Sequence, residues 1–252
     1  MGFKKMGRVW LASLALGLLA LGGCATKVPM AVDSETKALD LSDKSVLMLM
    51  VDIGRSEKSR FVPEPYFLNI GVLDKDGKFT EGKIQSMDGD GEFEINDDKT
   101  RYLFRIPAPE GKTNLPNIYG QAKAFPLVGQ FSLPVGLDVP VKKGSVIYLG
   151  RLEAVLRPRT DKEYRAGPVI PLIDQAATGL SSGTFDIKLV DRSAEDFPMI
   201  RKAYPALANT PIETMLLPIP DRSYFDRQWA GEDMTGVDPY KGSVSNKPVA
   251  AQ

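Results

Sequence analysis

The sequence predicts a mainly β protein: an antiparallel β-sandwich with one short helix near residues 196–204 and a disordered C-terminal tail. Three observations support this fold class. At least seven short segments have the alternating or wholly apolar patterns of strands, and turn signals separate them. The 23 glycines and 19 prolines indicate many turns, and 43% hydrophobic residues suffice for a core. Helical periodicity is convincing in a single segment.

The first predicted strand covers residues 46–53, whose sequence VLMLMVDI is apolar on both alternate faces up to Asp52. That pattern is typical of a central strand with both faces covered. Residues 55–65 follow as a polar loop with two prolines, and residues 67–73 form the next strand. Asp74-Lys75-Asp76-Gly77 then has glycine where a tight turn needs a positive φ angle, which predicts a hairpin.

Two further segments predict strands with one face exposed to solvent. Residues 92–95 alternate in polarity, and residues 101–106 place three apolar side chains on one face and the arginines on the other. Residues 131–141 contain Pro134 and Pro140, so this segment is expected as an edge strand or as two short strands separated by Gly136.

The last clear strands cover residues 146–156 and 184–190. In the first of them, all even-numbered residues are apolar, which predicts one continuous core face. The second places Phe185, Ile187 and Leu189 inward. Residues 212–217 are a final, short candidate strand.

The predicted helix covers residues 196–204. Asp196 is a suitable N-cap, and Pro198 falls in the first turn, where its missing N–H costs little. From residue 218 the pattern is lost, and residues 242–252 are expected to be disordered. The expected organisation is therefore a signal peptide at 1–23, a lipidated N-terminus and tether at 24–44, a sandwich domain at 45–217 and an irregular extension at 218–252.

The N-terminal residues have the parts of an export signal. Lys4, Lys5 and Arg8 are followed by an apolar run of 13 residues, 9–21, which is short of the roughly 20 that a membrane-spanning helix needs. Small residues then lead to Cys24, the single cysteine of the chain. A plain secretory signal, cleaved without lipidation, is one interpretation of these features.

The residues Leu21-Gly22-Gly23-Cys24 resemble the lipobox of bacterial lipoproteins. This resemblance implies cleavage after Gly23 and acylation of the Cys24 thiol, with this covalent lipid as the expected cofactor. Three acyl chains would hold the protein firmly in a membrane. Similarity to the sorting rule of double-membraned bacteria adds that Ala25, in place of Asp, implies transfer to the outer membrane, with the domain facing the periplasm.

Composition excludes several chemistries. Without residues 1–23, the chain has 29 basic and 32 acidic residues, so it lacks the basic footprint that nucleic acid requires. The absence of histidine removes Ser-His-Asp and Cys-His catalytic sites and histidine-ligated metal sites. One cysteine allows no internal disulfide.

The segment from about residue 101 to 197 is similar to domains of uncharacterised bacterial lipoproteins with a transthyretin-like or immunoglobulin-like sandwich. Two stretches carry this resemblance: residues 140–150, with the sequence PVKKGSVIYLG, and residues 183–187, with the sequence GTFDI. They are a turn with its following strand and a second strand. The resemblance therefore supports the fold and implies little about activity.

Residues 88–92, Asp-Gly-Asp-Gly-Glu, contain the candidate metal ligands Asp88, Asp90 and Glu92. Calcium prefers clustered oxygen ligands, but an EF-hand alignment puts Phe93 at the required glycine and Lys99 at the bidentate glutamate. A glycine-rich turn between strands is the simpler interpretation, and no metal is expected.

Two other groups of charged residues suggest chemistry. Glu153 and Asp186 lie on predicted strands and would suit glycoside hydrolysis if they faced one another across 5–10 Å; exposed positions are the simpler interpretation. The densest basic cluster comprises Arg157, Arg159, Lys162 and Arg165, beside the polar loop 172–183. It fits either a solvated hairpin tip or a contact with an anionic surface.

The sequence thus predicts a membrane-anchored, non-enzymatic binding or structural module of the cell envelope. Its expected partners are the membrane, through the lipid, and an envelope protein or glycan. The alternative is a histidine-free envelope carbohydrate hydrolase that uses paired carboxylates.

Overall fold

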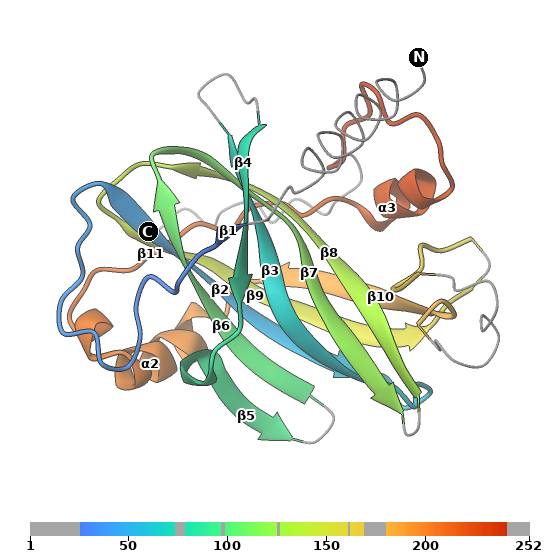
Figure 1. Ribbon diagram of the computed structural model, residues 1–252, viewed down its shortest axis with the longest axis horizontal. Coiled ribbons are helices and arrows are strands. Elements are labelled where there is room, and N and C mark those ends of the chain that lie inside the picture. Colours follow the sequence, from blue (N-terminus) through green and yellow to red (C-terminus); the bar gives the residue numbers. More distant parts are fainter. Residues whose placement is uncertain are drawn as a thin grey trace, which may run out of the picture.

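The protein is a β-sandwich of two sheets (Figure 1). The computed structural model describes residues 26–73, 79–96, 99–124, 127–160, 162–168 and 180–240. In sheet order, sheet A contains β1 (Thr26–Lys27), β4 (Phe79–Ser86), β3 (Val62–Leu73), β7 (Gly111–Ala124) and β8 (Leu127–Val141). Sheet B contains β10 (Gly183–Val190), β9 (Val146–Pro158), β2 (Lys44–Arg55), β6 (Lys99–Pro109) and β5 (Glu92–Asn96), and β11 (Glu213–Thr214) pairs with β9.

Most strand pairs are antiparallel, as predicted, but β2 and β9 run parallel, with Val46 opposite Val146. The prediction of a central strand at residues 46–53 is confirmed, because β2 lies between β9 and β6 and every residue from 45 to 54 is buried. β3 and β4 form the predicted hairpin; the turn at residues 74–77 lies outside the described residues.

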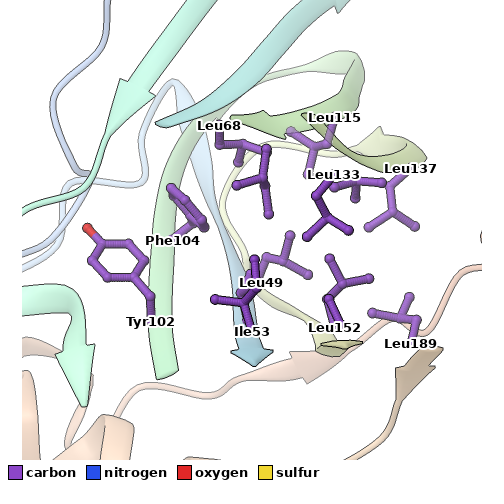
Figure 2. Close-up of a cluster of buried hydrophobic side chains, with 14 of the residues drawn as sticks. Leu49, Ile53, Leu68, Tyr102, Phe104, Leu115, Leu133, Leu137, Leu152 and Leu189 are labelled. Carbon is purple, nitrogen blue, oxygen red and sulfur yellow. The ribbon is translucent and has the colours of Figure 1, made fainter. Parts of the chain in front are cut away.

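The main core lies between the two sheets. Leucine side chains of sheet A and the inner side chains of sheet B meet there (Figure 2). Leu49 and Phe104 of sheet B and Leu68 and Leu133 of sheet A are fully buried. Burial of one such side chain contributes about 1.5–3 kcal/mol, so this layer supplies most of the driving force for folding.

A second layer covers the outer face of sheet B. It consists of helix α2 (Ser193–Ala203), the 3-10 turn η2 (Pro205–Leu207) and the N-terminal segment, which pack against Met48, Met50 and Leu103. The arginine face of β6, expected to be exposed, is therefore covered, and Arg105 is completely buried. At its central strand, β2, sheet B is therefore buried on both faces.

The N-terminal segment, expected as a tether over 24–44, packs on the sandwich from Thr26 onward. The Val28 N–H donates to the Ile84 carbonyl at 2.8 Å, and the Ala31 N–H donates to the Arg105 carbonyl at 2.8 Å. Val32 is 1% exposed in the outer apolar cluster. This segment lacks periodicity because it crosses the sheet as an irregular strap.

A β-bulge at Gly150 interrupts the core face predicted for residues 146–156. Ile147 and Leu149 face the main core, and after the extra residue Leu152 does so, which turns Arg151 outward. Gly150 has a φ of +106°, a backbone conformation that favours glycine. The continuous even-numbered face was therefore wrong.

Other strands begin or bend differently from the prediction. β3 starts at Val62 and includes Pro63 and Pro65, which were expected in a loop. Residues 127–141 form a single edge strand, β8, and Gly136, with a φ of +65°, lies where the register with β7 shifts. The inward side chains predicted for residues 184–190 are confirmed for Phe185 and Leu189.

The helices also extend the prediction. α2 begins at Ser193, three residues before Asp196, so Asp196 lies within the helix instead of capping it. A second helix, α3 (Arg222–Trp229), is capped by Asp221 within the extension that was expected to be irregular. The tail at residues 242–252 lies outside the described residues. Neither helix in the described part of the chain is long and apolar enough to cross a membrane.

Candidate functional site

Charged side chains are buried between sheet B and its outer cover. Arg151, 3% exposed, makes a double contact with the carboxylate of Asp196, which is fully buried on α2, and the Tyr148 hydroxyl donates to the same carboxylate. Burial, together with this carboxylate, raises the pKa of Tyr148 well above its usual range. The contacts of Arg151 and Tyr148 with Asp196 thus hold α2 against β9.

Asp52 forms the second part of this polar layer. Its carboxylate accepts two hydrogen bonds from Arg101, at 2.6 and 2.8 Å, and forms an ion pair with Lys99 at 2.8 Å. Burial alone would raise the pKa of Asp52, but these donors outweigh it and hold that pKa below its usual value. Asp52 therefore remains ionised although it is 1% exposed.

Arg105 is the centre of the third part. Its guanidinium donates to the Val32 carbonyl at 2.7 Å, to the Tyr204 hydroxyl at 2.9 Å and to the Asp88 carboxylate at 2.6 Å. Tyr204 in turn donates to the Asp90 carbonyl at 2.6 Å, and burial raises the pKa of Tyr204 to about 12. One arginine thus joins the N-terminal strap, the helix layer and the loop after β4.

The three candidate metal ligands are not gathered around one point. Asp88 accepts from Arg105, from the Tyr102 hydroxyl and from the Gly91 N–H, while Asp90 accepts from the Ser34 N–H and hydroxyl at 3.0 and 2.9 Å. Over the described ranges, no group of three or more His, Cys, Asp or Glu side chains is placed to hold a metal ion.

The same loop forms a 3-10 turn, η1 (Gly89–Gly91), as the simpler interpretation predicted a turn. The glycine at 91 is required by close packing. A Cβ atom there would lie 2.4 Å from the Arg105 guanidinium and 2.5 Å from the Tyr102 ring. The Tyr102 hydroxyl points away from the leucines and toward this turn (Figure 2). Gly91 is thus a packing residue.

A pocket of about 300 Å³ opens beside η1. Residues of β3, of the loop after β4 and of the first positions of β5 and β6 line it, among them Tyr66, Asp88 and Glu92. Tyr66 is the extra residue where the β3–β7 register shifts, and this bulge leaves its side chain 43% exposed. Glu64, also in the wall, accepts from Lys123 at 2.5 Å.

These residues give the pocket a definite chemistry. The ring of Tyr66 and the side chains of Pro65 and Met87 supply apolar surface, whereas Glu64, Asp88 and Glu92 supply carboxylate oxygens. Because Lys123 and Arg105 already pair with Glu64 and Asp88, such a wall favours a ligand that offers hydrogen-bond donors beside an apolar face. The sequence prediction identified Asp88 and Glu92 as candidates but missed Tyr66, whose exposure depends on an unpredicted bulge.

Glu153 and Asp186, the carboxylates considered for hydrolysis, do not lie directly opposite one another. In the β9–β10 register Asp186 lies opposite Val155, and Glu153 lies opposite Lys188. Each acid is engaged elsewhere: Asp186 accepts from Arg157 at 2.7 Å, and Glu153 pairs with Arg192 at 3.2 Å. The two acids are therefore diagonal neighbours on one face of the sheet, and each is paired with an arginine.

The basic cluster is largely offset by acids. Arg157 pairs with Glu163 at 2.6 Å as well as with Asp186, and Arg159 donates to the Glu163 carbonyl at 2.6 Å. The hydrogen bond from Arg157 holds the pKa of Glu163 well below its usual range. Arg165 donates to the Ser181 carbonyl at 3.2 Å, and Lys162 is exposed. Most of loop 172–183 lies outside the described residues.

Cys24 and Gly23, the predicted lipidation and cleavage residues, also lie outside the described residues. Comparison with protein-family models, with curated proteins and with solved structures found no match.

Proposed function

We propose that this protein is a lipid-anchored binding module of the bacterial cell envelope. Signal cleavage after Gly23 and acylation of Cys24 attach it to the outer membrane, where the sandwich faces the periplasm and binds an envelope component. The lipobox-like sequence Leu21-Gly22-Gly23-Cys24 is the observation that carries this proposal.

The pocket beside η1 supports a binding role, and the residues in its wall indicate which class of ligand would fit. Tyr66 offers an exposed ring, and Glu64 and Glu92 offer acceptors close to it. Pockets that combine apolar surface with a few polar groups are the usual sites for ligands. A donor-rich segment of an envelope protein or glycan fits this wall.

Membrane fractionation tests the anchor. The wild type is expected in the membrane fraction, with an acylated N-terminal Cys24 detected by mass spectrometry, whereas Cys24→Ser is expected in the soluble periplasmic fraction. A Cys24→Ser variant that remains bound to membranes would contradict lipid anchoring.

In vivo crosslinking of the lipidated protein, followed by purification from membranes, tests the binding role. Tyr66→Ala should remove the specific crosslinked partner, because it deletes the exposed ring of the pocket. Trp229→Ala is the matched control: Trp229 is 49% exposed on α3, away from the pocket. Equal recovery of the partner with both variants would dismiss this pocket as the binding site.

A further inference from the structure

The folded domain begins almost at the predicted lipidation site. Ala25 alone separates Cys24 from Thr26, the first residue of β1. Two residues of chain span at most about 7 Å in any conformation. β1 pairs with β4, and the Val28 N–H bond to Ile84 extends this attachment. A lipid on Cys24 is therefore held close to sheet A itself.

This reach is comparable to the thickness of the polar layer of a bilayer. The hydrocarbon core is about 30 Å thick within a total of about 40–45 Å, which leaves about 5–7 Å of headgroups on each side. Acyl chains on Cys24 must enter the hydrocarbon, so Thr26 comes to lie among the headgroups or directly above them.

We propose that the edge of sheet A formed by β1 and the first half of β4 lies against the phospholipid headgroups. This inference rests on the proposed function, because it requires acylation of Cys24. The surface suits that contact. Thr26, Lys27, Thr80 and Glu81 are exposed. Lys83 is the strand partner of Thr26, and its ammonium pairs with Glu81 at 2.9 Å. Hydroxyl and ammonium donors match phosphate oxygens.

The direction of β1 places the pocket beyond this contact. β1 and β4 run parallel, so the chain leaves Cys24 in the direction that leads along β4 toward Ser86 (Figure 1). Met87 and Asp88, in the pocket wall, follow immediately. Lys83 and Met87 are four residues apart, about 13 Å along a strand. The pocket wall therefore lies further along β4 than the proposed contact.

Fluorescence quenching in vesicles tests this orientation. The native thiol is blocked by acylation, so one introduced cysteine, at Glu81→Cys or at Val128→Cys, takes an environment-sensitive dye. Val128, 54% exposed on β8, lies at the opposite edge of sheet A. In vesicles of phosphatidylethanolamine and phosphatidylglycerol with headgroup quenchers, the Glu81→Cys label should lose most of its fluorescence and the Val128→Cys label little.

A linker variant provides the control. Twenty Gly/Ser residues inserted between Ala25 and Thr26 keep the lipid but lengthen the connection to about 25 Å. Quenching at Glu81→Cys should then fall to the Val128→Cys value. A vesicle-bound protein in which both labels are equally quenched, or in which the linker has no effect, overturns the orientation and leaves anchoring intact. Absence of acyl chains on Cys24, read by mass spectrometry, overturns both.

Discussion

Around its central strand β2, sheet B is buried on both faces, yet the chemistry of the two faces differs. The inner face meets sheet A through apolar side chains such as Leu49, Phe104 and Leu152. The outer face combines an apolar cluster with the buried charges of Asp52, Arg105 and Arg151. Inner contacts are non-directional, whereas each outer charge needs a particular partner. The inner face thus provides stability, and the outer face fixes how the N-terminal strap and α2 lie on the sheet.

The largest effect is expected on the inner face. Phe104→Ala removes a fully buried ring that packs edge-on against Tyr102, with 4.8 Å between the two ring centroids. The substitution should lower the free energy of unfolding by about 4 kcal/mol. Urea unfolding measures this change. The control Val155→Ala, at a residue 40% exposed on β9, should change it by less than about 0.5 kcal/mol. Similar losses from both variants would contradict the assignment of the core.

On the outer face, Asp196→Ala should cost about 3 kcal/mol, because it leaves Arg151 buried without its main partner. Glu195, at 3.2 Å, and Asp52, at 3.8 Å, keep the loss from being larger. Replacing both members, with Arg151→Met and Asp196→Leu, should restore most of the stability. If the double variant were as unstable as Asp196→Ala, the Arg151–Asp196 pair would stabilise the fold by more than the neutralisation of each buried charge by the other.

The outer face should also give the protein an acid-sensitive component of stability. The pKa of Asp52 is lower in the folded chain than its usual value of 3.8, so its contribution is complete above that pH and is lost as the pH falls through the folded value. Asp52→Asn should flatten the stability profile below about pH 4, with a smaller effect than Asp196→Ala. Parallel profiles for wild type and variant in thermal melts would contradict this role.

The smallest effect is expected at Tyr204. Tyr204→Phe keeps the ring that lies 4.9 Å from the Arg105 guanidinium but removes the hydroxyl between Arg105 and Asp90, which should cost about 1 kcal/mol. In the wild type, burial raises the pKa of this phenol to about 12, so its stabilisation is complete below about pH 10 and is lost toward pH 12. Urea unfolding at pH 7 and pH 11 separates the two effects, because the loss of stability in the variant should be about 1 kcal/mol at pH 7 and smaller at pH 11. A loss at pH 7 well above this value would mean that the ring has moved.

The sequence predicted the sandwich because most of its strands follow simple periodicity, as β10 does. It could not show that the arginine face of β6 is covered, since the cover comes from an irregular segment about 70 residues earlier that contacts it through backbone groups, such as the Val32 carbonyl. The bulge at Gly150 was also hidden, because residues 146–149 are apolar on both faces and so fit either register. The pocket itself was not predicted: Asp88 and Glu92 stood out only as candidate metal ligands, and the exposure of Tyr66 depends on tertiary pairing.

The parallel pairing of β2 with β9 has a consequence for how the chain folds. Val46 and its partner Val146 are 100 residues apart, whereas the antiparallel partners of β2 come from residues 99–109. Closing so long a loop slows folding, because chain entropy is lost before the contact forms. The chain is synthesised from its N-terminus, so about 100 further residues must be made before the apolar segment VLMLMV can pair with β9. Until then one edge of this segment is unpaired. Until then this strand is a template for intermolecular pairing, which makes early shielding by a chaperone valuable to this protein.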